Sequence, residues 1–312
     1  MQNNSLVKIY LLSITKWTKE LKTNPDFKPL VLFNLPIIAV VGVFILIPSM
    51  GTFITSFFRD VSFLNIKFLG ITNYTRLFTD PNFWQSVFFT LAFVVVSVAL
   101  ELLIGLLFAI FLNKTMPARG LLRLVLLIPW LIPIVISARI WELMYSFDFG
   151  ILNFLLIKLK IIGSNINWLG SPFKAFISIV ISDVWKTTPF MTIILLAGLS
   201  TIPLDIYKQA QIDGATFRQQ FLKITLPLLK PIIVVALLFR TIDAVRIFDL
   251  IYVLTGGGPG GATTSLSVFA FKQYIGGDFG YGSAVSMVIF FIAGLFAVLY
   301  IKFGRFKESL NE

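Results

Sequence analysis

Residues 207–231 read YKQAQIDGATFRQQFLKITLPLLKP, a polar stretch between two strongly apolar parts of the chain. We expect the stretch to divide at Gly214, because glycine readily adopts the left-handed conformation found just past the end of a helix. The helix before it should present a narrow apolar face made by Leu204, Tyr207 and Ala210. A hinged polar segment in an otherwise apolar chain predicts a surface on which a partner protein docks.

The two short helices carry signals for their ends. Ser200 or Thr201 can cap the first helix, and Pro203 suits its first turn, where no amide hydrogen bond is lost. Asp213 is expected to cap the second helix by accepting hydrogen bonds from nearby backbone amides. The apolar side of the second helix is formed by three residues at helical spacing: Phe217, Phe221 and Ile224.

The composition indicates a protein of the lipid bilayer. Hydrophobic residues make up 57% of the 312 residues and charged residues only 13%, whereas soluble domains carry about 25% charged residues. The apolar runs are continuous over about 20 residues, as in spanning helices, and do not alternate over about ten, as in membrane β-barrels. We therefore expect an all-α, polytopic membrane protein.

Six apolar runs are long enough to cross a bilayer. They cover residues 31–57, 85–112, 121–145, 175–199, 227–254 and 283–302. Residues 151–162 are apolar but too short to cross, and are expected to form an interfacial or re-entrant helix. The chain should therefore comprise an N-terminal segment (1–30), a membrane domain (31–302) with a polar loop at 200–226, and a tail (303–312).

Basic residues orient these spans, because short cytoplasmic loops are rich in lysine and arginine. They gather before the first span, between the second and third, before the fifth and after the sixth. Both termini and residues 207–231 are therefore expected in the cytoplasm. Residues 6–21 have apolar side chains on one side, which suits an amphipathic helix in the membrane interface; a loose basic tail is the alternative.

Several chemistries are excluded by what the sequence lacks. It has no cysteine and no histidine, so we expect no disulfide, no metal site and no catalytic residue. It has no G-x-x-x-x-G-K-[ST] run, so this chain is expected to bind no cofactor, and any ATP and magnesium would be held by another chain. The net charge of +11 fits cytoplasmic loops better than nucleic acid, which is not an expected partner.

The polar stretch also contains a spaced motif. Lys208-Gln209-Ala210 is followed after three intervening residues by Gly214, and after nine more intervening residues by Ile224-Thr225-Leu226-Pro227. This spacing resembles the EAA signature of ABC importer permeases, which forms a cytoplasmic coupling helix seated in a groove of the ATP-binding subunit. The resemblance implies an ATPase-coupling role for the matching positions and their neighbours: Lys208, Gln209, Ala210, Asp213, Gly214, Ala215, Phe217, Phe221, Ile224, Leu226 and Pro227.

The first two positions of the motif depart from the family's pattern. The signature normally begins with glutamate followed by alanine, and this chain has Lys208 and Gln209 there. Because the charge is reversed, the family's polar contact at this position cannot be carried over, and we predict instead that an acidic residue of the partner faces Lys208.

Other segments resemble the carbohydrate-uptake branch of the same family, which contains the maltose and glycerol-phosphate permeases. The similarity is carried by FLGITNY at 68–74, DFGILN at 148–153 and FDLIYVLTGGGPG at 248–260, the last of which resembles the first-subunit type. The resemblance implies the type I permease fold in a prokaryotic cell membrane. It also implies a second, different permease, two ATP-binding subunits and an external solute-binding protein. The cargo would be a mono-, di- or oligosaccharide, or a related polyol or glycerol phosphate.

Residues 255–261 form a glycine-rich segment on the expected outer side of the membrane. Glycine lets the backbone bend freely and approach a partner closely, so we expect a flexible loop. It could contact the external binding protein through Gly256, Gly257, Gly258 and Pro259. A plain solvated turn is the alternative.

Ionisable residues inside the expected spans are costly and usually face a bundle interior or a water-filled path. Four pairs lie three residues apart and could form ion pairs within their helices: Arg139 with Glu142, Asp183 with Lys186, Arg240 with Asp243, and Arg246 with Asp249. Together with Tyr145 and Tyr252, they are candidates for a polar solute path, and structural ion pairing is the alternative. Glu101 has no obvious partner, and a structural role is favoured for it.

Two other function classes remain open. An ion-coupled secondary transporter would carry its own ion site and often shows repeated halves, of which none is obvious here. A membrane enzyme would need a convergent catalytic set, which a chain without histidine and cysteine is poorly equipped to supply.

Overall fold

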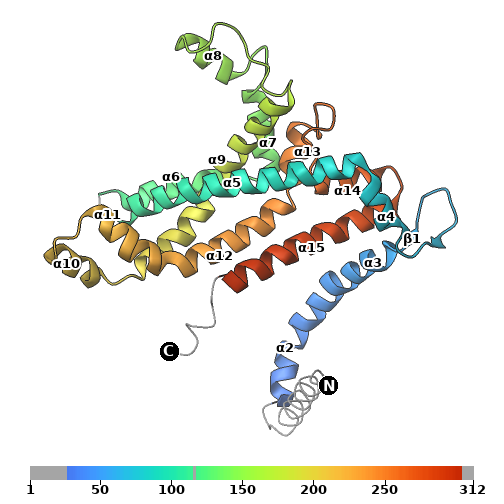
Figure 1. The fold of residues 1–312 in the computed structure, drawn as a ribbon, viewed down its shortest axis with the longest axis horizontal. Coiled ribbons are helices and arrows are strands. Elements are labelled where there is room, and N and C mark those ends of the chain that lie inside the picture. The colour runs from blue at the N-terminus through green and yellow to red at the C-terminus, as the bar shows by residue number, and fades with distance from the viewer. Residues whose placement is uncertain (1–26, 115–116, 304–312) are drawn as a thin grey trace. The chain divides into compact units, whose positions relative to one another are not determined.

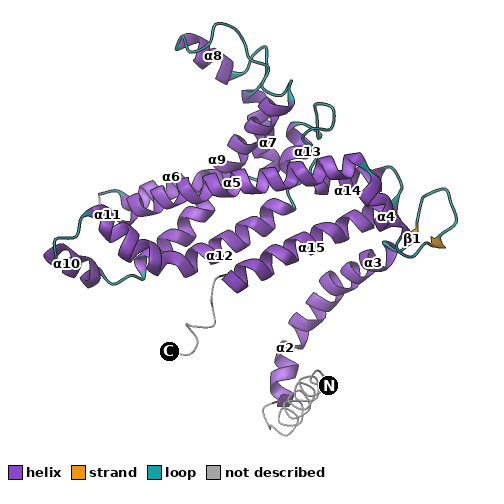
Figure 2. Ribbon diagram, in the orientation of Figure 1, coloured by secondary structure: helices purple, strands orange, loops and turns teal. Residues whose placement is uncertain are grey.

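The computed structural model describes residues 27–114 and 117–303. The expected N-terminal interfacial helix and C-terminal tail lie almost entirely outside these residues. The described chain is nearly all helix, as the sequence predicted (Figure 1, Figure 2). It divides into two units, Met1–Ile54 and Thr55–Glu312, and each is considered by itself.

The N-terminal unit holds one long apolar helix. Helix α2 (Phe27–Val41) continues through a π-helical turn, η1 (Gly42–Leu46), into α3 (Ile47–Thr55). Residues Leu32–Thr55 are apolar and long enough to cross a membrane. The first expected span is therefore confirmed.

The second unit opens with a short hairpin that the all-α prediction did not include. Strand β1 (Phe58–Arg59) pairs antiparallel with β2 (Lys67–Phe68), with Phe58 opposite Phe68. Strands of two residues have no detectable alternation in sequence, because period-2 patterns need about four residues. Helix α4 (Thr72–Thr79) follows and leads to the membrane helices.

Helices α5 (Pro81–Asn113) and α9 (Pro172–Ser200) form the central pair of this unit. Asp80 starts α5 by accepting a hydrogen bond from the amide of Asn82 at 2.9 Å, with Pro81 in the first turn. Gly105 lets the two helices approach closely, because a Cβ there would lie 3.0 Å from Cβ of Met191. The second and fourth expected spans are both confirmed, each a few residues longer than expected.

The third expected span is not one straight helix. Helix α6 (Arg119–Leu131) and α7 (Ile134–Met144) meet at a bend of 90°. The bend falls at Ile132-Pro133, since proline lacks the amide that would continue the hydrogen-bond ladder. The described chain has five helices long and apolar enough to span a membrane, or six with this bent pair counted as one span.

The fifth expected span is also interrupted. Helix α11 (Phe217–Gln220), the π-helical turn η2 (Phe221–Thr225) and α12 (Leu226–Val245) run continuously, but the helix ends at Val245. A separate helix, α13 (Asp249–Leu254), follows. The hydroxyl of Ser265 donates to the carbonyl of Ile247 at 2.8 Å, which satisfies backbone freed by the break.

The remaining helices are peripheral or C-terminal. Helix α8 (Ile151–Lys158) is short, as expected for an apolar run that cannot cross a membrane. Helix α10 (Leu204–Ile212) precedes α11, and α14 (Leu266–Ile275) packs against α15. Helix α15 (Phe279–Phe303) confirms the sixth expected span.

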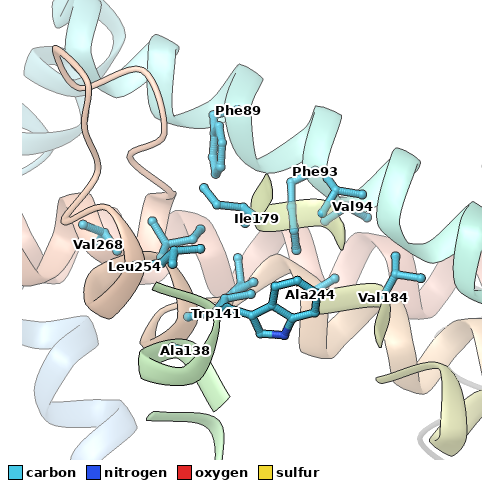
Figure 3. Close-up of a cluster of buried hydrophobic side chains, with 14 of the residues drawn as sticks. Phe89, Phe93, Val94, Ala138, Trp141, Ile179, Val184, Ala244, Leu254 and Val268 are labelled. Carbon is cyan, nitrogen blue, oxygen red and sulfur yellow. The ribbon is translucent and has the colours of Figure 1, made fainter. Parts of the chain in front are cut away.

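The main apolar core joins six helices of the second unit. Phe89 and Phe93 of α5 have nearly parallel rings, with centroids 6.3 Å apart, and they point toward Ile179 of α9 (Figure 3). Trp141 of α7 lies below them in the same view. Helices α12, α13 and α14 complete the cluster with small and aliphatic side chains, among them Ala244, Leu254 and Val268.

Candidate functional site

The polar stretch at 207–231 forms a hinged pair of helices at one end of the bundle (Figure 1). Helix α10 ends at Ile212, and Gly214 has a left-handed φ of +75°. The amides of Gly214 and Ala215 bond back to carbonyls of α10, at 3.1 and 2.8 Å, which closes its last turn. The expected division of the stretch at Gly214 is confirmed.

The expected helix caps are wrong. Thr216 caps α11 in place of Asp213: its hydroxyl accepts from the amide of Gln219, whose side chain accepts from the amide of Thr216 at 2.8 Å. This reciprocal pattern needs a glutamine three residues after the cap, and only Thr216 has one. Ser200 and Thr201 bond back to carbonyls of α9 and do not cap α10.

The helix pair exposes apolar side chains to its surroundings. Leu204 and Phe217 are each 70% exposed, and Ile212 is 79% exposed. On the inner side, the hydroxyls of Tyr207 and Thr225 lie 3.0 Å apart and tie α10 to η2. Exposed apolar residues on a polar, well-anchored element are typical of a docking surface. Among the other motif positions, Phe221 and Ile224 are half-buried, while Gln209, Asp213 and Pro227 are exposed.

Lys208 has an acidic partner within its own helix. Its amino group lies 2.8 Å from a carboxylate oxygen of Asp205, and both side chains are largely exposed. Exposed pairs of this kind contribute little stability. The amino group therefore remains accessible to a second acidic group, and the expected acid on a partner protein stays a prediction.

The deepest charged group of the described chain lies at the far end of α12. The Arg240 side chain is 2% exposed and lies between Glu101 of α5 and Asp183 of α9, which are equally buried. Its guanidinium binds Glu101 through Nε and through Nη2, the latter at 2.9 Å, and binds Asp183 through Nη2. Thr187 donates to Glu101 at 2.7 Å. Three helices are thus joined by one fork of charge-assisted hydrogen bonds.

A chain of alternating charges leads from this buried cluster to the surface. Asp243 lies 3.4 Å from Nη1 of Arg240 and 3.3 Å from Nη2 of Arg246. The Asp243 and Arg246 side chains are 57% and 68% exposed. Asp243 therefore connects a buried arginine with an exposed one.

The expected pairs within helices are only partly present. Arg139 and Glu142 pair at 2.6 Å, and Arg240 pairs with Asp243, as predicted. The other two expected pairs, Asp183 with Lys186 and Arg246 with Asp249, are wrong. Glu101, for which the sequence offered no obvious partner, pairs with Arg240. Residue spacing reveals neighbours on the same helix only, whereas Glu101 and Asp183 meet their partner across helices.

Lys186 serves the bend between α6 and α7. Its amino group donates to the carbonyl of Ile132 at 2.5 Å and lies 3.3 and 3.5 Å from those of Trp130 and Pro129. The proline at the bend leaves these carbonyls without amide partners, and the lysine supplies donors. The spacing of charged residues along α9 does not reveal this role, because the acceptors are backbone carbonyls of another helix.

The two candidate tyrosines have different environments. Tyr145 is buried, and its hydroxyl donates to the carbonyl of Ser178 at 3.0 Å. Tyr252 is 43% exposed and stacks on Phe248, with ring centroids 5.2 Å apart. Asp249 is half-buried in the first turn of α13. Tyr252 therefore keeps a free aromatic surface, and Tyr145 belongs to the core.

The glycine-rich loop is ordered by its own hydrogen bonds. Gly256, Gly257, Gly260 and Gly261 all have positive φ, which glycine alone adopts at little cost. Thr263 and Thr264 donate to the carbonyls of Gly258 and Gly257, at 2.5 and 3.2 Å. The loop is thus held by hydrogen bonds of its own, which the expectation of a flexible segment did not foresee. Gly256 and Gly260 are exposed, Gly258 and Pro259 are half-buried, and Gly257 is buried.

Comparison with known proteins places these features in one family. Residues 101–307 match the family model described as "Binding-protein-dependent transport system inner membrane component". The trehalose/maltose transport system permease protein MalF of Thermococcus litoralis is 54% identical, over 89% of this chain and 94% of that protein. The sulfoquinovosyl glycerol transport system permease protein SmoG of Agrobacterium fabrum is 37% identical, over 99% of this chain and all of that protein.

A solved structure has the same fold. A chain of a bacterial ABC transporter involved in the import of the acidic polysaccharide alginate superposes with a TM-score of 0.78. The match covers 93% of this chain and 98% of that chain at 23% sequence identity. These matches give no support to an ion-coupled secondary transporter.

The buried cluster predicts a large and asymmetric response to substitution. Arg240→Met leaves two buried carboxylates uncompensated and should destabilise the detergent-solubilised chain by about 3–5 kcal/mol. Adding Glu101→Gln and Asp183→Asn removes both uncompensated charges and should restore most of the loss. Thermal unfolding measures each variant.

Arg246→Met is the matched control, since Arg246 also pairs with Asp243 but is exposed. It should change the stability by about 1 kcal/mol or less. Equal losses for Arg240→Met and Arg246→Met would show that the buried cluster has no special weight.

Proposed function

We propose that this chain is the permease subunit of an ATP-driven importer for a disaccharide of the trehalose or maltose kind. The chain belongs to the inner-membrane components of binding-protein-dependent transport systems. The observation that carries the proposal is the hinged α10–α11 element with its exposed apolar side chains. The choice of sugar rests on the similarity to a trehalose/maltose permease; the relative named for sulfoquinovosyl glycerol supports the wider carbohydrate class.

The α10–α11 element is the proposed coupling surface for a separate ATP-binding subunit. Leu204, Ile212 and Phe217 offer apolar contacts, and Gly214 sets the angle between the helices. ATP and magnesium bind on that subunit, and this chain hydrolyses nothing. Two ATP-binding subunits complete the importer, one for each permease.

The helix that follows the coupling surface transmits its movement. Residues Phe217–Val245 run as continuous helix from the coupling surface to the buried cluster at Arg240. At about 1.5 Å per residue, Phe217 and Arg240 lie about 35 Å apart along this helix. Displacement at α11 therefore acts on the helix that also carries Asp243, in the membrane part of the chain.

The exposed charges near the end of α12 support both a solute path and a second permease. Asp243 and Arg246 would be costly against lipid, so they face water or another protein. We assign them, with Tyr252 and the Arg139–Glu142 pair, to a polar path at the boundary with a second, different permease subunit. The more buried groups Asp183, Lys186 and Arg240 hold in place the helices that form this boundary.

The orientation follows from the coupling surface. α10 and α11 lie in the cytoplasm, together with both termini, and the ordered loop at Gly256–Pro259 lies outside, where an external binding protein delivers the sugar. The fixed backbone of this loop suits a docking contact, because little conformational entropy is lost on binding.

Uptake by reconstituted vesicles tests the function. Proteoliposomes with this chain, the second permease, the ATP-binding subunits and the binding protein should accumulate radiolabelled trehalose or maltose only when ATP is present on the coupling side. Omitting the ATP-binding subunits should abolish uptake, since this chain has no nucleotide site. Uptake by this chain alone, driven by a sodium or proton gradient, would overturn the proposal.

Two substitutions at Gly214 test the hinge. Gly214→Val disfavours positive φ by about 1–2 kcal/mol and should lower sugar-stimulated ATP hydrolysis and uptake together, because the two helices change their angle. Gly214→Asn is the matched control, since asparagine tolerates the left-handed conformation. It should keep most of the activity. Parental activity in both variants would exclude a role for the hinge.

Two substitutions near the end of α12 test the path. Asp243→Asn and Arg246→Gln should each lower uptake several-fold while the complex still assembles and hydrolyses ATP, since both side chains are exposed. Lys230→Gln, on the same helix but near the coupling surface, is the control and should leave uptake unchanged. Normal uptake in both Asp243→Asn and Arg246→Gln would remove these residues from the path.

A further inference from the structure

A long groove runs along one side of α5, α6 and α9. It consists of two adjoining cavities that share Leu126 of α6. The first has a volume of about 500 Å³ and is lined almost entirely by apolar side chains, including Ile104, Val184 and Trp185. The second has about 520 Å³ and contains Arg119 and Arg123. Both volumes lie in the range of about 300–1,000 Å³ found for ligand sites.

The groove has the length of a membrane. Its lining on α9 extends from Val180 to Ser200, at steps of three and four residues along one helix face. Twenty residues of helix measure about 30 Å, which is the thickness of the hydrocarbon layer. The apolar cavity therefore lies at the depth of lipid tails, and the two arginines lie toward the end of the groove that adjoins α10.

The two arginines at that end lack acidic partners. Nε of Arg119 donates to the carbonyl of Leu112 at 2.6 Å. Nε of Arg123 is buried and has no hydrogen-bond partner. Within the part of the chain that the structure describes, no carboxylate lies within 4.0 Å of either guanidinium. Nε of Arg123 is closed off within the chain, so an acceptor from outside would bind the terminal nitrogens of the two guanidiniums. An arginine without an acidic partner is costly next to a bilayer, and such an acceptor is therefore called for.

We propose that this groove binds one anionic phospholipid, whose phosphate is held by Arg119 and Arg123 and whose acyl chain lies in the apolar cavity. Guanidinium groups bind phosphate oxygens in a paired, planar geometry. Basic pockets between spanning helices on the cytoplasmic side suit anionic lipid head groups. A free phosphate ion alone would leave the apolar cavity beyond Leu126 unfilled, whereas a phospholipid fills it with its acyl chain.

The lipid would stabilise the part of the bundle that carries the coupling surface. Helix α9 ends at Ser200, which lines the groove, and α10 starts at Leu204. Occupation of the groove holds α6 against α9 at this end. This site is separate from the solute path and does not depend on which sugar is carried.

Native mass spectrometry of the full-length chain tests the proposal. The chain, purified in mild detergent, is incubated with equal amounts of phosphatidylglycerol and phosphatidylcholine. One phosphatidylglycerol per chain should be retained, at about tenfold or more over phosphatidylcholine, because only the former has a net negative head group. Equal retention of the two lipids would overturn the proposal.

Paired variants separate the head-group contact from general charge. Arg119→Gln with Arg123→Gln should lose the preference for phosphatidylglycerol. Lys230→Gln with Lys302→Gln removes the same charge from exposed positions outside the groove and should keep the preference. Equal losses in the two double variants would overturn the site. Arg119→Lys with Arg123→Lys preserves the charge but loses the paired geometry, and should keep a reduced preference for phosphatidylglycerol. Complete loss of the preference there, in a chain that unfolds at the parental temperature, would contradict recognition of the phosphate by positive charge.

A third variant tests the acyl chain. Leu126→Trp fills the groove where the two cavities meet and leaves both arginines in place. It should lower phosphatidylglycerol retention about tenfold, because each buried methylene of the chain contributes to binding. Unchanged retention would show that only the head group binds. Cross-links from Leu126 to a helix of the second permease in the assembled importer would show that protein, and not lipid, fills the groove.

Discussion

The guanidinium of Arg240 is the group on which the second unit depends. It is buried in the interior of a membrane protein, where water cannot solvate it, and its buried partners are the carboxylates of Glu101 and Asp183. These carboxylates come from α5 and α9, so the three helices must keep one register for all three charges to remain paired. A shift of α12 by one turn would expose three buried charges to an apolar environment. The attraction between apolar side chains around Phe93 has no preferred direction, whereas each hydrogen-bonded charge requires its partner in one place.

This constraint ties the proposed coupling surface at α10 and α11 to the membrane part of the chain through continuous helix. The helix that leaves the surface at Phe217 is anchored at Arg240, and it carries only one irregularity, the π-helical turn η2. A helix held at both ends moves as a body together with the helices it is tied to. The bend between α6 and α7 is fixed in the same way, because Lys186 of α9 holds the carbonyls at the break. Under the proposed coupling, motion that starts at α10 and α11 would therefore be passed on as displacement of packed helices.

The sequence predicted the features that depend on a single helix, such as its length, its apolarity and the residue at its end. Hydropathy located the spans, because lipid imposes the same length and apolarity on each of them. The positive φ of Gly214 was predictable, since few residues other than glycine tolerate it. The partner of Glu101 was not, because Arg240 lies 139 residues away and meets it only through the packing of α12 on α5. The bend at Pro133 was hidden for a related reason: an apolar run looks the same whether it is straight or broken.

The described chain satisfies its deepest charges internally and leaves the outer ones exposed. Arg240 has two buried partners, but Asp243 and Arg246 have only each other and the edge of that cluster. In a bilayer, such exposure is tolerated only against water or another protein. The same reasoning applies to Arg119 and Arg123 at the other end of the bundle, where no carboxylate of the described chain is within reach. The exposed or unpaired charges thus mark the surfaces at which we propose that other molecules complete the chain: a second permease near α13, and an anionic head group beside α6.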